Sequence, residues 1–111
     1  MTEVEIYLNI DPEHRFTEKE DADREFALWY YSDKTGEAAA EEAFHISNAP
    51  DEMLTDKQKH IKQRWKGRSL SVGDVVVVIN IEDALVIRKH YLCCGSGWKQ
   101  IYPETPKGTI V

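Results

Sequence analysis

The fold is decided by the stretch Arg68-Ser69-Leu70-Ser71-Val72-Gly73-Asp74-Val75-Val76-Val77-Val78-Ile79-Asn80-Ile81. Its first half is rich in turn-forming residues, and Gly73-Asp74 predicts a tight entry into a strand. An uninterrupted β-branched run follows, which is typical of a central strand. We therefore predict that residues 69–74 form a turn that feeds this strand, and that Val75, Val77 and Ile79 face the helices.

A strand with five consecutive apolar residues needs cover on both faces, because an exposed ribbon of this kind would aggregate. The predicted helices can cover only one face of so small a sheet. The other face, with Val76 and Val78, then needs the N-terminal strand, the C-terminal segment or a second copy of the chain. This leaves two outcomes open, a homodimer or a sheet that curls toward a small barrel.

Four further segments have strand patterns. Residues 4–10 alternate apolar and polar side chains, as in a half-buried strand. Residues 25–31 are rich in aromatic residues, which favour strands. Residues 84–93 and 98–102 follow the central strand, with turns at Glu82-Asp83 and at residues 94–97. The last three strands are therefore predicted to form a meander.

Two helices are predicted between the early strands and the central one. Residues 37–47 are rich in alanine and glutamate, and Phe44 is expected to anchor this helix to the sheet. Thr55 can cap a second helix that runs to about Lys66. Its apolar stripe includes Trp65, which we expect to be at least half buried. Residues 17–20 resemble a capping box, so a short helical turn is predicted there, with one longer helix as the alternative.

The elements together predict one α+β domain over residues 1–102, with residues 103–111 as a C-terminal arm. The chain has 111 residues, of which 41% are hydrophobic and 31% charged, a globular composition. We expect a mostly antiparallel sheet of about five strands with two helices on one face. No apolar run approaches the length of a membrane span, and the first residues lack the pattern of a secretory signal. The adjacent Cys93 and Cys94 form no disulfide framework, so a cytoplasmic location is expected.

The central stretch also carries a resemblance. In the YodL-like domain family a Ser-Leu-Ser-Val run precedes Gly or Ser, then Asp, then valines, and an aromatic strand and a Gly-aromatic pair follow. This chain is similar over residues 37–101, through Phe44, Asn48, Tyr91 and the motif residues Ser69, Leu70, Ser71, Gly73, Asp74, Gly97 and Trp98. The resemblance implies a bacterial or phage origin and a tie to mobile genetic elements, but no established activity. The turn chemistry of the motif residues indicates a structural role.

Two charged segments are candidate binding sites. Residues 1–56 carry a net charge of −12 and residues 57–111 one of +6. An acidic run holds the candidate partner-binding residues Glu18, Glu20, Asp21, Asp23 and Glu25, which form either a solvated surface or a patch that imitates DNA phosphates. A basic segment, residues 57–68, holds the candidate nucleic-acid contacts Lys57, Lys59, Lys62, Arg64, Lys66 and Arg68.

The sequence shows no catalytic set, and an enzyme stays open only as a third alternative that a deep pocket holding His90 and a cysteine would support. The spacing of His90, Cys93 and Cys94 matches no metal-binding pattern, and no carboxylate pair lies in an apolar context, so neither metal nor cofactor is expected. Our first hypothesis is a non-enzymatic protein-binding accessory protein of a mobile element or phage. Its partner would be a host defence or replication factor, and it could be an anti-restriction or anti-CRISPR inhibitor. The alternative is a nucleic-acid-binding module that uses the basic segment.

Overall fold

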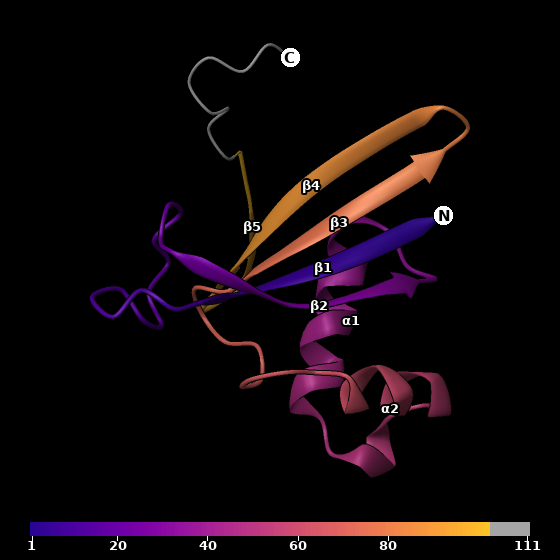
Figure 1. Ribbon diagram of the computed structural model, residues 1–111, viewed down its shortest axis with the longest axis horizontal. Helices are drawn as coiled ribbons and strands as arrows, with labels where there is room; N and C mark the ends of the chain where they lie inside the picture. Colours follow the sequence, from indigo (N-terminus) through magenta and orange to yellow (C-terminus); the bar gives the residue numbers. More distant parts are fainter. Residues whose placement is uncertain (103–111) are drawn as a thin grey trace.

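A five-stranded antiparallel sheet forms the body of the chain in the computed structural model, which describes residues 1–102 (Figure 1). Its strands are β1 (Thr2–Asn9), β2 (Arg24–Ser32), β3 (Val75–Glu82), β4 (Leu85–Cys94) and β5 (Gly97–Ile101). They lie in the order β2-β1-β3-β4-β5, so the predicted meander of the last three strands is confirmed. Within residues 1–102 the sheet stays open and does not close into a barrel. The predicted C-terminal arm, residues 103–111, lies outside the described residues.

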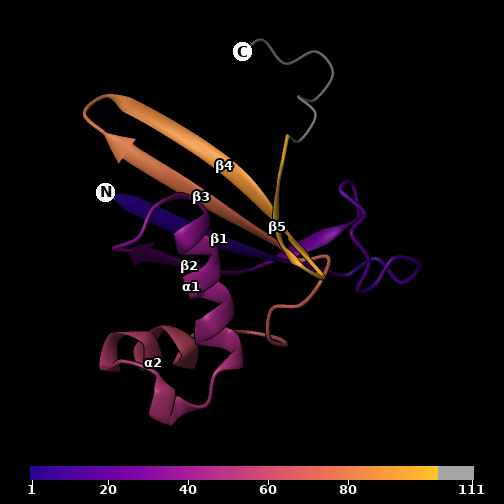
Figure 2. The same cartoon turned by 180° about the vertical axis from the view of Figure 1, so that it is seen from behind.

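Two helices pack on one face of the sheet, as the α+β prediction requires (Figure 2). They are α1 (Gly36–Asn48) and α2 (Asp56–Gln63), with the 3-10 turn η1 (Asp51–Met53) between them. Thr55 caps α2 through a reciprocal capping box with Gln58. In the described part of the chain, neither helix has the length and apolar character that a membrane span needs.

The main core lies between the helices and the sheet. Ala40, Ala43 and Ile46 of α1 pack against Val76 and Val78 of β3, which are 0% and 2% exposed. The prediction that Val75, Val77 and Ile79 face the helices is therefore wrong, because the alternate valines do so. When every residue of a strand is apolar, the sequence does not show which alternate residues face the helices. A shift of one residue exchanges the two faces of the strand.

A second, smaller apolar cluster covers the opposite face of β3. Val75, Val77 and Ile79 pack there against Leu92 of β4 and Ile101 of β5, and each is at most 5% exposed. One copy of the chain thus covers both faces of β3. The expected need for a second copy over Val76 and Val78 disappears, since the helices cover those two residues.

The segment between β1 and β2 differs from its prediction. Residues 17–20 form no helical turn, because the Thr17 hydroxyl donates to the carbonyl of His14 and does not act as an N-cap acceptor. Arg24 secures this loop instead, since its guanidinium donates to the carbonyls of Lys19, Glu20 and Ala22. The strand prediction for residues 25–31 is confirmed, since β2 spans Arg24–Ser32.

Trp65 lies just beyond α2, which ends at Gln63 and not at Lys66 as predicted. Hydrogen bonds from Arg64 N–H to the Ile61 carbonyl and from Trp65 N–H to the Lys62 carbonyl tighten the chain there and end the regular helix. The Trp65 ring is partly buried against the main core, and its Nε1 donates to the Arg68 carbonyl (2.9 Å). The expectation of at least half burial is confirmed.

Replacement of this ring should weaken the fold. We expect Trp65→Ala to lower the free energy of unfolding by roughly 3 kcal/mol, as large-to-small changes in a core do. Chemical denaturation followed by circular dichroism measures the change. A loss below about 0.5 kcal/mol would show that the ring contributes no packing.

Candidate interaction surfaces

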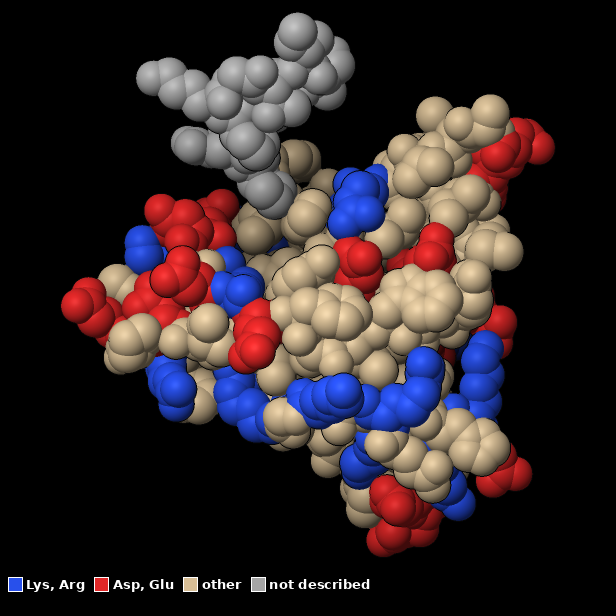
Figure 3. Space-filling view, viewed as in Figure 1, with Lys and Arg blue, Asp and Glu red and all other residues tan. Residues whose placement is uncertain are grey.

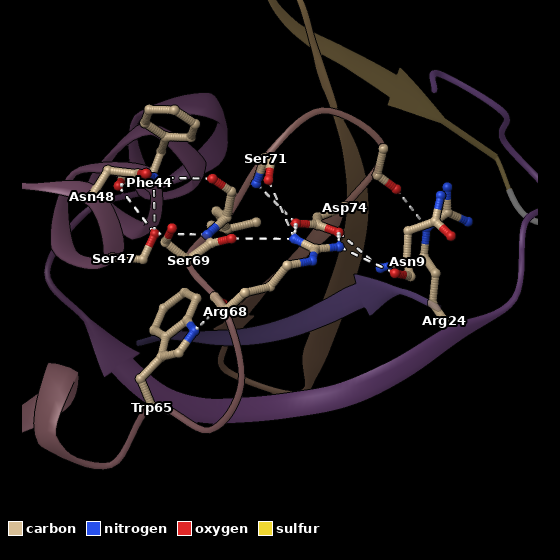
Figure 4. Close-up of polar contacts among 12 residues, drawn as sticks. Asn9, Arg24, Phe44, Ser47, Asn48, Trp65, Arg68, Ser69, Ser71 and Asp74 are labelled. Carbon is tan, nitrogen blue, oxygen red and sulfur yellow. Dashed lines mark hydrogen bonds and ion pairs between the residues drawn. The ribbon is translucent and has the colours of Figure 1, made fainter. Parts of the chain in front are cut away.

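Residues of the segment 68–74 meet around one buried carboxylate, that of Asp74, which is 0% exposed (Figure 4). Arg68 forms a bidentate ion pair with it, at 2.5 Å from Nη1 to Oδ2 and 2.7 Å from Nη2 to Oδ1. The backbone N–H groups of Asn9 and Ser71 donate to the same carboxylate at 2.7 and 2.8 Å. The hydrogen bond to Asp74 raises the pKa of Arg68 above its ordinary value. This group of contacts, which we call the Asp74 hub, joins the end of β1 to the start of β3.

The neighbouring motif residues extend these connections. The Leu70 N–H donates to the Ser47 hydroxyl, and Asn48 Nδ2 donates to the Leu70 carbonyl, so the end of α1 is tied to the turn. Gly73 has a φ of +97°, and a Cβ there would come within 2.5 Å of the Thr17 carbonyl oxygen. Only glycine fits this approach. On β5, opposite Cys93, Trp98 donates to Glu41 and packs edge-on against Phe44.

The acidic run lies mostly in the loop between β1 and β2. Glu20 forms an ion pair with Lys99 of β5 (2.7 Å), and Asp21 forms one with Lys19 (2.7 Å). Glu18 accepts from the Gly95 N–H (3.0 Å). Three of the five candidate residues are therefore engaged within the chain, and Asp23 and Glu25 have no side-chain partner among residues 1–102. This surface is less negative than its sequence suggests.

Several cations of the basic segment are likewise engaged in ion pairs within the chain. Lys57 pairs with Asp33 (3.0 Å), Lys62 pairs with Asp51 (3.3 Å), and Arg68 belongs to the Asp74 hub. Lys59, Arg64 and Lys66 have no side-chain partner among residues 1–102. In Figure 3 the Lys and Arg side chains form a row beside the sheet. Two hollows of about 310 and 450 Å³ lie along the outer edge of β2 and are lined in part by residues of this segment.

An aromatic surface that the sequence pattern did not predict lies on the helix-free side of the sheet. We call it the aromatic face and define it by Tyr7 of β1 and by Phe26, Trp29 and Tyr31 of β2. Phe26 and Tyr31 are 53% and 50% exposed. The rings pack in edge-to-face pairs, with centroids 4.7 Å apart for Trp29 and Tyr31 and 5.8 Å apart for Tyr7 and Phe26. Figure 3 shows broad uncharged surface on this side of the molecule.

Carboxylates of β1 hold these rings in place. Trp29 Nε1 donates to Glu3 (2.8 Å), and the Tyr7 hydroxyl donates to Glu5 (3.2 Å). Glu5 also pairs with Arg88 of β4 across the sheet (2.8 Å). The signal for this surface was present in the aromatic residues 26–31 and in Tyr7, on the polar side of its strand. The sequence did not show which side chains of β2 point toward the helices and which point away from them.

The cysteine and histidine residues do not come together as a reactive site. Cys93 is buried in the sheet, and burial raises the pKa of its thiol to about 11, so thiolate is scarce near neutral pH. His90 lies beside a pocket of about 210 Å³ on the helix-free face, where burial lowers its pKa. Within residues 1–102, no three His, Cys, Asp or Glu side chains gather as candidate metal ligands.

Loss of the buried carboxylate should be the most damaging single change at these sites. We expect Asp74→Ala to cost about 3 kcal/mol, because it leaves Arg68 and two backbone N–H groups without their acceptor. Asp33→Ala is the matched control, since it breaks an exposed ion pair and should leave the unfolding midpoint nearly unchanged. Equal losses in the two variants, measured by chemical denaturation, would contradict the role given to the hub.

Comparisons with known proteins found no match for this chain. No family model, no curated protein and no solved structure matches the chain. The resemblance to the YodL-like domain family therefore stays a prediction from the sequence, and the interaction surfaces are interpreted from their own geometry.

Proposed function

We propose that this chain is a non-enzymatic protein-binding module that docks a partner on the aromatic face. The observation that supports this most is the exposure of Phe26 and Tyr31, each about half accessible on an ordered sheet. Aromatic rings fixed before binding lose little conformational entropy when a partner covers them. They also provide the large contact areas that dominate the energetics of protein interfaces.

Charge on this surface favours a protein partner over a nucleic acid. Glu3 lies among the rings and has no cationic partner among residues 1–102, so it would repel the phosphates of a nucleic acid strand, whereas Glu5 is already paired with Arg88. The Glu3 carboxylate suits a lysine or arginine side chain, and such side chains also bind to aromatic rings through cation–π contacts. The net charge of −6 would steer a basic partner toward the chain.

The more specific hypothesis is that the partner belongs to a host defence or replication system. It rests on the resemblance to a family associated with mobile elements, as does the proposed role as an anti-restriction or anti-CRISPR inhibitor. An inhibitor that imitates DNA needs rows of unpaired carboxylates. Since Glu18, Glu20 and Asp21 are engaged within the chain, docking through the aromatic face has more support than DNA mimicry.

A nucleic-acid-binding module remains the second candidate, for one specific reason. The hollows along β2 combine cations with aromatic rings, since Lys66 and Phe26 line one of them and Arg64 and Tyr31 line the other. Single-stranded nucleic acids bind to surfaces that combine positive charge with stacking rings. Only three cations of the basic segment have no partner among the described residues, so the expected binding is weak.

Affinity capture from a bacterial lysate, at low and at high salt, tests the first proposal. We expect the wild-type chain to retain a protein at both salt concentrations, and the double variant Phe26→Ser, Tyr31→Ser to lose it. Met53→Ser is the matched control, because Met53 of η1 is 63% exposed and lies outside the aromatic face. Absence of any retained protein, or equal loss in the control, would overturn the proposal.

An electrophoretic shift assay with single-stranded RNA and DNA tests the second candidate. We expect no shift even at about 50 mM salt, where phosphate contacts are strongest. A shift that disappears in the triple variant Lys59→Ala, Arg64→Ala, Lys66→Ala would favour the nucleic-acid-binding module.

A further inference from the structure

The hairpin of β3 and β4 projects beyond its neighbours and leaves one strand edge open (Figure 1). β5 pairs with β4 only from His90 to Cys94, so residues 85–89 have no partner on that side within residues 1–102. Leu85, Val86 and Ile87 are 61%, 57% and 43% exposed there. An aliphatic strand with a free edge is a template for pairing with another chain.

The outer strands β2 and β5 have features that hinder pairing with another chain, and residues 85–89 lack these features. In β2 the register shifts so that Ala27 has no partner on β1, and irregularities of this type hinder edge pairing. β5 is short and presents Lys99. Residues 85–89 hold two charges: the Arg88 guanidinium reaches across the sheet to Glu5, away from the open edge, and Lys89 lies at the end of the segment, next to His90, where β5 begins to pair.

The hydrogen-bonding direction along β4 follows from its neighbours. Cys93 N–H donates to the Asp74 carbonyl, and Cys93 C=O accepts from the Gly73 N–H, so the main-chain groups of Cys93 point toward the β3 side. Direction alternates along an antiparallel strand. The main-chain groups of Val86 and Arg88 therefore point outward at the open edge.

We propose that residues 85–89 bind the same segment of a second copy of this chain, as an antiparallel pair with Ile87 on the two-fold axis. Val86 of one copy then pairs with Arg88 of the other, and the two equivalent pairs exchange four main-chain hydrogen bonds. Leu85 lies opposite Lys89 of the partner copy, so no like charges are directly opposite each other. The two Arg88 side chains are diagonal neighbours across the axis, and each is paired with Glu5 of its own copy. An axis at Arg88 would place two guanidinium groups side by side, which is unfavourable.

This dimer goes beyond the proposed function and does not depend on it. The two-fold axis is perpendicular to the sheet, because Ile87 meets its own equivalent on the same face. The two sheets join into one, with both pairs of helices on one side and both aromatic faces on the other. A partner with two binding sites would be held more tightly by such a dimer than by one copy.

Sedimentation velocity over a wide range of protein concentration tests the proposal on the full chain. We expect the mass to rise to twice that of the monomer. Ile87→Asp and Ile87→Lys should each remain monomeric, because each places like charges at the axis, and an equimolar mixture of the two should form a heterodimer. Ile10→Asp is the matched control, since Ile10 is 44% exposed and lies far from the hairpin, and it should still dimerise.

Each other outcome overturns the proposal. A wild-type chain that is monomeric at every concentration shows that nothing pairs with this edge in solution, or that another segment of the same chain covers it. A dimer that survives both Ile87 substitutions uses a different surface. A mixture that stays monomeric, while each variant keeps the wild-type thermal unfolding midpoint, excludes the register with Ile87 at the axis.

Discussion

The buried ion pair between Arg68 and Asp74 is the interaction on which the rest of the structure depends. A carboxylate that is fully removed from water must have its acceptor positions satisfied, and Arg68, Asn9 and Ser71 supply the donors. These donors come from the end of β1 and from the turn before β3, so the pair aligns the two central strands. Hydrogen bonds between Cys93 and the main chain of Gly73 and Asp74 add β4 to the same register. The side of β3 that faces the helices is thereby fixed.

This arrangement also explains why the charged segments are weak candidates for binding. Arg68, Lys57 and Lys62 bind carboxylates of the same chain, and Glu20 and Asp21 bind lysines. Exposed ion pairs contribute little stability, but they remove charge that a partner would otherwise meet. The features without such compensation are apolar: the rings of the aromatic face and the aliphatic edge of β4. Surfaces of this kind are often functional on small domains, and they are the basis of the proposed contacts with another protein.

Sequence periodicity predicted the strands and helices, but it did not predict which face of a strand packs against the helices. The alternation in residues 4–10 marked β1 and the capping residue Thr55 marked the start of α2, because each signal is local. The faces of β3 could not be assigned, since its valines are all apolar and a buried contact 65 residues away, between Asp74 and Asn9, sets its register. The pairing of Glu20 with Lys99 joins residues that are still further apart in sequence, by 79 residues. The open edge of β4 was visible in principle, because the segment predicted for β4 was twice as long as that for β5.

The central claim is that the Asp74 hub fixes the sheet, while the open edge of β4 pairs with a second copy. Amide hydrogen exchange of the unmodified chain, followed by NMR at low and high protein concentration, tests this claim most directly. The amides of Asn9, Ser71 and Cys93 should be among the slowest to exchange at both concentrations, because they donate to Asp74. The amides of Val86 and Arg88 should exchange fast in dilute solution and slowly in concentrated solution. Fast exchange at Asn9 and Ser71, or concentration-dependent protection in residues 57–68 in place of residues 85–89, would contradict the account.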